Sequence, residues 1–171
     1  NQQVAALNPA GAPTVCDSIT VLLASATSPY AFTDTVKSLL MTNGTVTATF
    51  PGKVYGNQYY IVLRQRNSLE TWSAVPITLD ATNVSYDFTL AASKAYGSNQ
   101  QVIGGVATLF SGDVNQDGLI EASDYALEEN GVSQFLFGYV REDLTGDQLV
   151  EAADYSLIEN NLLLFLFTSR P

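Results

Sequence analysis

Between about residues 15 and 110, apolar side chains alternate with polar ones at the two-residue period of β-strands. The segments rich in Val, Ile, Thr, Tyr and Phe are 18–25, 45–50, 59–66, 75–79, 84–90 and 102–110. Turn-forming pairs such as Asn43-Gly44 and Gly97-Ser98 separate them. Segment 33–42 is also predicted to be a strand, with a helix as the alternative. About seven short strands in about 95 residues predict an immunoglobulin-like β-sandwich over residues 15–111.

The first residues, "NQQVAALNPAGAP", have a different pattern. Pro9, Gly11 and Pro13 oppose regular structure, so residues 1–14 are predicted to be an extended arm or linker. The chain begins at Asn1 and shows no signal peptide, which indicates a processed or trimmed product.

Beyond residue 112 the chain repeats itself. Residues 113–137 align with residues 143–167 without a gap, and 13 of the 25 positions are identical. A unit of about 30 residues cannot bury a core alone, so each copy is expected to pack against its twin. A short helix is predicted in each copy, starting near Ala122 and Ala152. The predicted fold is therefore mainly β with a small α part, the latter over residues 112–171.

Each copy begins with a twelve-residue window that carries oxygen atoms at the spacing of a calcium-binding loop. The predicted ligands of the first loop are Asp113, Asn115, Asp117, the backbone carbonyl of Leu119, Glu121 and Asp124. Those of the second are Asp143, Thr145, Asp147, the carbonyl of Leu149, Glu151 and Asp154. The alternative is an acidic turn without a metal, but its eight carboxylates would then repel one another at a cost on the order of kcal/mol each. We therefore predict two Ca²⁺ sites.

The second loop departs further from a calcium-loop pattern than the first. Gln148 stands where Gly118 stands in the first loop, at a cost of about 1 kcal/mol if its φ is positive. Thr145 offers a neutral hydroxyl. At position 8, Ile120 and Val150 are predicted to form a short two-stranded contact between the loops. A strand, not a helix, is expected before the first loop, which favours a structural calcium over a calcium-sensing switch.

Charge and composition exclude several classes of function. The formal net charge is −10, and residues 113–171 carry all of it, because the charges of residues 1–112 sum to zero. Such an acidic chain argues against nucleic-acid binding, and no apolar run is long enough to span a membrane. With no histidine and one cysteine, Cys16, histidine-based catalysis and an internal disulfide are excluded, while an intermolecular disulfide stays open. Arg64, Arg66, Glu70 and Trp72 could line a small polar site, with a strand face and a turn as the alternative.

The motifs "SGDVNQDGLIEASDY" and "REDLTGDQLVEAADY" resemble the duplicated loop-helix repeats of type I dockerins over about residues 113–167. With the preceding "YYIVLRQRNSLETWS", the chain is also similar to the C-terminal module of large bacterial surface and secreted proteins. The resemblance implies calcium in both loops and a cohesin partner. Dockerins contact cohesin through a Ser/Thr pair at loop positions 10 and 11, which are here Ala122-Ser123 and Ala152-Ala153. Where dockerins place basic residues later in the helix, this chain has Glu128, Glu129, Asn130, Glu159, Asn160 and Asn161. The calcium ligands therefore carry over and the cohesin-binding face does not.

Three hypotheses follow for the function. The first is an extracellular or cell-surface structural protein, a fibre subunit or a module of an adhesin, that self-associates and is not an enzyme. The second is a docking module for a cohesin-like partner protein. The third is a sugar-binding domain or an enzyme with structural calcium. The apolar hexamers 132–137 and 162–167 could pack in the core or be offered to a neighbour. Glycans are possible at Asn43, Asn83, Ser18 and Thr35, which lie in short glycosylation-like triplets.

Overall fold

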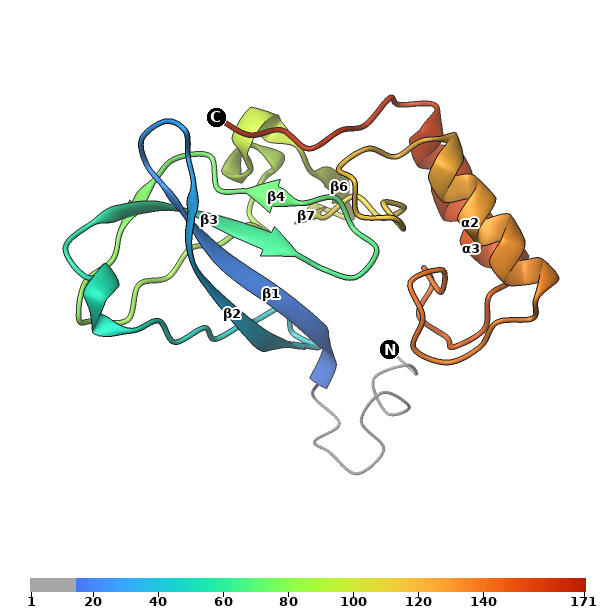
Figure 1. Ribbon diagram of the computed structural model, residues 1–171, viewed down its shortest axis with the longest axis horizontal. Helices are drawn as coiled ribbons and strands as arrows, with labels where there is room; N and C mark the ends of the chain where they lie inside the picture. Colours follow the sequence, from blue (N-terminus) through green and yellow to red (C-terminus); the bar gives the residue numbers. More distant parts are fainter. Residues whose placement is uncertain (1–14) are drawn as a thin grey trace.

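A computed structural model describes residues 15–171 of the chain, so the arm predicted at residues 1–14 lies outside the described residues. The structure is mainly β with two short helices (Figure 1). We refer to residues 15–111 as the β unit and to residues 112–171 as the repeat module. The sheets lie at one end of the molecule and the two helices lie side by side at the other, as both views show.

The β unit is built on a five-stranded antiparallel sheet in the order β2-β1-β3-β4, with β5 also paired to β3. Its strands are β1 (Val15–Ser25), β2 (Phe32–Met41), β3 (Gln58–Arg64), β4 (Thr71–Trp72) and β5 (Ile77–Thr78). The long β1 is the central strand, with Val21 opposite Val36 of β2 and Leu63 of β3. The strand predicted at 33–42 is thus confirmed.

Both faces of β1 are covered over residues 21–24, which explains why this stretch is continuously apolar. On one face, Leu22 and Ala24 join Tyr60, Val62 and Trp72 in a buried cluster. On the other face lie Ile19, Val21 and Leu23, all buried. The core of the β unit therefore lies on the two sides of one sheet.

Several expected strands take another form. The predicted strand 102–110 is a hairpin of β6 (Gln101–Ile103) and β7 (Val106–Thr108). Gly104 and Gly105 both have positive φ, as a tight two-residue hairpin turn requires. Segment 75–79 forms only the two residues of β5, and segments 45–50 and 84–90 form no strand. Three short 3₁₀ helices complete the unit: η1 (Gly52–Val54), η2 (Ala92–Lys94) and η3 (Tyr96–Ser98).

The repeat module contains α2 (Ala122–Ser133) and α3 (Ala152–Leu162), at the positions that the sequence predicts. The contacts between the two repeats are reciprocal: each repeat makes the same contact to the other. The Ile120 N–H donates to the Leu166 carbonyl over 3.0 Å, and the Val150 N–H donates to the Leu136 carbonyl over 3.2 Å. Tyr125 lies against its own repeat equivalent, Tyr155, with ring centroids 5.2 Å apart. The two copies are therefore related by an approximate twofold axis.

This arrangement corrects the expectation that position 8 joins the two loops. Ile120 and Val150 each pair with the segment that follows the other copy's helix, and not with each other. The reason lies in the short connections, because each chain segment leaving a helix passes directly beside the other copy's loop. Leu136 and Leu166 of the apolar hexamers are half-buried there.

After α3 the chain runs back over the β unit, as the red segment of Figure 1 shows. The Asn99 side-chain amide donates to the Phe167 carbonyl over 3.0 Å. Ser169 lies so close to Gly97 that a Cβ at position 97 would clash with the Ser169 hydroxyl. The end of the repeat module is thus packed on the β unit. Among the described residues, no helix is both long and apolar enough to cross a membrane.

Candidate metal centre

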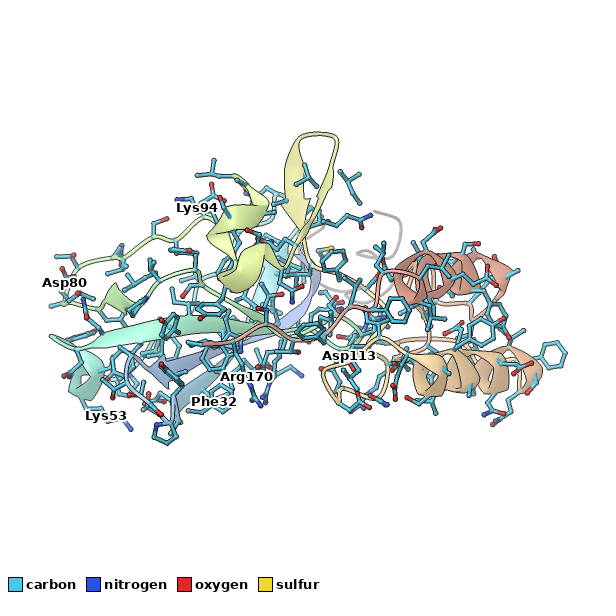
Figure 2. All side chains as sticks on the ribbon, turned by 90° about the horizontal axis from the view of Figure 1, so that it is seen from above. Phe32, Lys53, Asp80, Lys94, Asp113 and Arg170 are labelled. Carbon is cyan, nitrogen blue, oxygen red and sulfur yellow. The ribbon has the colours of Figure 1, made fainter. Side chains whose placement is uncertain are left out.

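Loop 1 (residues 113–124) is organised around two buried carboxylates, those of Asp113 and Asp124. One oxygen of Asp124 accepts the N–H groups of Val114 and Asn115 over 2.8 and 3.0 Å, and the other accepts the N–H of Glu121 over 3.0 Å. Asp124 therefore joins the start of the loop to the start of α2. Figure 2 places Asp113 where the repeat module meets the sheet.

The middle of loop 1 is shaped by short side-chain to backbone bonds. The Asn115 Oδ1 accepts the Asp117 N–H over 2.8 Å, and the Asp117 Oδ1 accepts the Leu119 N–H over 2.9 Å. Gly118 donates its N–H to Asp113 Oδ2 over 3.2 Å. These bonds hold oxygens of Asp113, Asn115 and Asp117 against the loop backbone.

Both loops place left-handed backbone at positions 4 and 6, but with the residue types exchanged. In loop 1 these positions are Gln116 (φ 63°) and Gly118 (φ 89°), whereas in loop 2 (residues 143–154) they are Gly146 (φ 81°) and Gln148 (φ 73°). Gln148 therefore has the positive φ at which a side chain costs about 1 kcal/mol. Each loop thus contains one glycine and one strained glutamine.

Asp113 provides the observation that best fits a metal ion. Its Oδ1 is buried and has no hydrogen-bond partner. Burial, with Asp124 nearby, raises the pKa of Asp113 to about 6. A buried carboxylate oxygen without a partner is costly unless a cation or proton compensates it. The acidic oxygens of loop 1 therefore fit a hard divalent cation such as Ca²⁺.

Loop 2 repeats the frame of loop 1 but differs at its first residue. Asp154 accepts the N–H groups of Leu144, Thr145 and Glu151, as Asp124 does in loop 1. Asp143 is buried, and its Oδ1 accepts the N–H of Gly146 over 2.7 Å. Burial raises the pKa of Asp143, and Arg66 acts in the opposite direction.

The guanidinium of Arg66 reaches loop 2 from the β unit. Its Nη2 lies 3.7 Å from Asp143 Oδ2, and its Nε lies 3.4 Å from Asp17 Oδ2. It also donates to the Val140 carbonyl and lies over the Tyr139 ring, 4.7 Å from the centroid. A protein cation therefore already neutralises part of the charge at loop 2.

The other predicted ligands are more open. Asp117, Leu119 and Glu121 are exposed in loop 1, and their equivalents Asp147, Leu149 and Glu151 are exposed in loop 2, as is Thr145. Across residues 15–171, no three His, Cys, Asp or Glu side chains are grouped as a metal site. An ion in loop 1 would therefore also need the predicted amide of Asn115 and carbonyl of Leu119.

Sequence reasoning missed the role of Glu128. Its side chain is fully buried in α2, and neither carboxylate oxygen has a hydrogen-bond partner. Burial, followed by the charges of Asp154, Glu142 and Asp143, raises its pKa to about 8. The repeat alignment contained the signal, because the equivalent position in α3 is the buried Ile158.

The small polar site considered around Arg64, Arg66, Glu70 and Trp72 is divided in two. Glu70 accepts from Arg64 Nε over 2.5 Å and from Trp72 Nε1 over 2.6 Å. Arg66 points instead to Asp17 and the repeat module. Arg64, Glu70 and Trp72 form one hydrogen-bonded cluster on the sheet. Arg66 belongs to the contact between the two units.

Comparisons with known proteins add no family assignment: no family model, curated protein or solved structure matches the chain.

Proposed function

We propose that this protein is an extracellular structural protein, a subunit of a surface fibre or a module of an adhesin, that self-assembles and is stabilised by calcium. In this proposal the β unit is an immunoglobulin-like sandwich and the repeat module is a dockerin-like calcium module. The protein has no catalytic role in this proposal.

The observation that carries the self-assembly is a set of exposed phenylalanines at equivalent positions of the two copies. Phe135 and Phe165 are 85% and 86% exposed, and Phe137 and Phe167 are 78% and 60% exposed. Four largely exposed aromatic rings on one small module are unusual for a monomer and typical of surfaces that bind another protein. Their regular placement supports contacts made between copies of the chain.

Calcium is assigned to loop 1 first. Asp113, Asn115, Asp117, the Leu119 carbonyl, Glu121 and Asp124 would hold the ion, and loop 2 would hold a second ion through its equivalent residues. When bound, calcium supplies positive charge that offsets the mutual repulsion of the loop carboxylates. The hydrogen bonds that Asp124 and Asp154 accept from loop N–H groups fix the backbone around each ion. Because sites of this type suit millimolar calcium, they fit an extracellular location.

The test is electron microscopy of the purified chain, first with millimolar calcium and then with excess chelator. Fibres that fray or dissociate on chelation are the expected result. An Asp113→Asn variant should need more calcium to assemble, and Glu129→Gln, which changes an exposed carboxylate outside both loops, is its control. Fibres that are equally stable with chelator would contradict the calcium part of the proposal.

Monodisperse particles under both conditions would contradict self-assembly. They would favour the second candidate, a docking module for a cohesin-like protein. The twofold relation of Phe137 and Phe167 favours this candidate specifically, because it would present one surface to a partner in two orientations. Pull-down with a cohesin domain would then separate the two functions.

A further inference from the structure

Two segments of the β unit have the pattern of strands but no strand partner. In segment 45–50, Val46, Ala48 and Phe50 are half-buried, whereas the alternating threonines are exposed. In segment 84–89, Tyr86 and Phe88 are half-buried between exposed neighbours. Within the described residues, neither segment belongs to a ladder. Their backbone pairing consists of an isolated bridge between Leu40 and Val46 and single hydrogen bonds at the ends, from Met41 N–H to the Thr45 carbonyl and from Ala107 N–H to the Thr89 carbonyl. Their backbones therefore remain able to pair with a further strand.

Both segments lie over the same face of the sheet, across a cavity of about 780 Å³. Ile19, Val21 and Leu23 of β1 line it, together with Ile61 and Leu63 of β3. Protein interiors are close-packed, and voids larger than a water molecule are few. A cavity of this size next to unpaired backbone is suited to a chain segment that brings both apolar side chains and backbone hydrogen-bonding groups.

The lining argues against a charged small molecule. Among the described residues that line the cavity, the charged ones are Asp80 and Asp87. Each already accepts bonds from a threonine two residues further on, Thr82 and Thr89. An uncharged segment with small apolar side chains fits this lining better.

The chain itself contains such a segment. Residues 3–8 read "QVAALN", and no charged side chain occurs in residues 1–14. We propose that residues 3–8 of one copy enter the cavity of a second copy as an added strand, next to segments 45–50 and 84–89. This inference rests on the proposed self-assembly and specifies the contact by which two copies would associate.

We expect the inserted strand to come from a second copy and not from the same chain. Pro9 and Pro13 both lie between residues 3–8 and β1, and the residue before each proline favours extended backbone. The six residues 9–14 span up to about 20 Å when extended. A linker of this length allows residues 3–8 to reach a neighbouring copy. Exchange of a terminal strand is a low-cost route to association.

Disulfide trapping tests the proposal. Two chains of different mass are prepared, both with Cys16→Ser. One also carries Leu7→Cys in the arm, and the other carries Ala48→Cys, whose half-buried side lies towards the cavity. After mixing in calcium and mild oxidation, a covalent heterodimer is expected. Thr35→Cys, at an exposed position of β2 outside the cavity lining, is the control and should cross-link at least fivefold less.

Other outcomes overturn the proposal. A chain with both Leu7→Cys and Ala48→Cys that cross-links only within itself would show that the segment returns to its own sheet. Absence of the cross-link, while the unmodified chain assembles by sedimentation, would reject strand insertion and leave the proposed self-assembly standing. An unmodified chain that sediments only as a monomer would reject the proposed self-assembly itself.

A second variant avoids any change in the β unit. Ala5→Glu with Leu7→Glu places two charges on the face of the added strand that carries Leu7, and at least a tenfold loss of the assembled fraction is expected. Assembly at the level of the unmodified chain would contradict the proposal, because an apolar cavity would not accept two carboxylates.

Discussion

Each of the two loops has a glutamine in the left-handed backbone conformation, Gln116 in loop 1 and Gln148 in loop 2. The left-handed positions are fixed by the loop geometry, so a glutamine at either of them costs backbone free energy. Gln116 gains something in return, because its amide donates to the carbonyls of Asp113 and Ser68 over 2.7 and 3.2 Å. Gln148 has a half-buried side chain in the equivalent of the glycine position of loop 1.

The same substitution should therefore have opposite effects in the two loops. Gln148→Gly is expected to raise the free energy of unfolding by about 0.5–1 kcal/mol, because it relieves the strain of a positive φ. Gln116→Gly should lower it by about 1 kcal/mol, because two hydrogen bonds are lost. Denaturant unfolding of both variants in chelator measures this. If both variants changed the free energy of unfolding in the same direction, the explanation would be contradicted.

Glu128 gives the molecule a pH dependence of stability. Its pKa of about 8 in the folded chain lies above the usual 4.5, so the folded state holds a proton that the unfolded state has released. Stability is therefore lost as the pH rises between these values. Glu128→Gln should remove this loss and stabilise the chain at pH 8 by about 3 kcal/mol. Urea unfolding in chelator at pH 5 to 8 measures it, and the exposed Glu129→Gln should leave the slope unchanged.

At the scale of elements, the helices and the long strands could be predicted from the sequence, because their signals are local. The helices begin at Ala122 and Ala152, directly after the acidic loops, and β1 and β3 follow apolar runs. The short strands could not be predicted, since pairing depends on partners far away in the chain. Segment 45–50 alternates as a strand should, but no described neighbour completes its ladder.

The candidate site was also predictable only in part. Ligand spacing identified both loops, and the buried Asp113 and Asp143 lie where the spacing placed them. Spacing could not show that Asp124 holds the backbone together, because that depends on how the loop closes. Nor could it bring Arg66 to Asp143, a contact between residues 77 positions apart in the chain.

The carboxylates that begin the helices should matter even without calcium. Asp154→Ala would leave the N–H groups of Leu144, Thr145 and Glu151 without their acceptor. The free energy of unfolding in chelator should fall by about 3 kcal/mol. Thermal unfolding measures the change. Glu159→Ala, at an exposed position of α3, should change stability little in chelator, and a fall as large as that of Asp154→Ala would contradict the explanation.

At the scale of the whole molecule, one arginine joins the two units. Arg66 lies between Asp17 of the β unit and Asp143 of the repeat module, and it packs on Tyr139. Asn67 adds hydrogen bonds of 3.0 Å to the carbonyls of Arg141 and Asp143. Loop 2 is thus held by residues of the β unit that follow β3.

Arg66→Ala should weaken this junction strongly, because it leaves two buried carboxylates without their cation. A loss of about 3–5 kcal/mol is expected, and calorimetry should show the repeat module unfolding before the β unit. Arg64→Ala removes a more exposed ion pair with Glu70 and should cost at most about 1 kcal/mol. A single unshifted transition for Arg66→Ala would show that the units are coupled by other contacts.

The approximate twofold axis of the repeat module has a consequence for the behaviour of the protein on dilution. Each copy uses the other as a symmetric subunit uses its partner in a homodimer, through the same surface on both sides. The short connection between Phe137 and Asp143 turns that association into an intramolecular one. The pairing of the two copies therefore does not depend on the protein concentration.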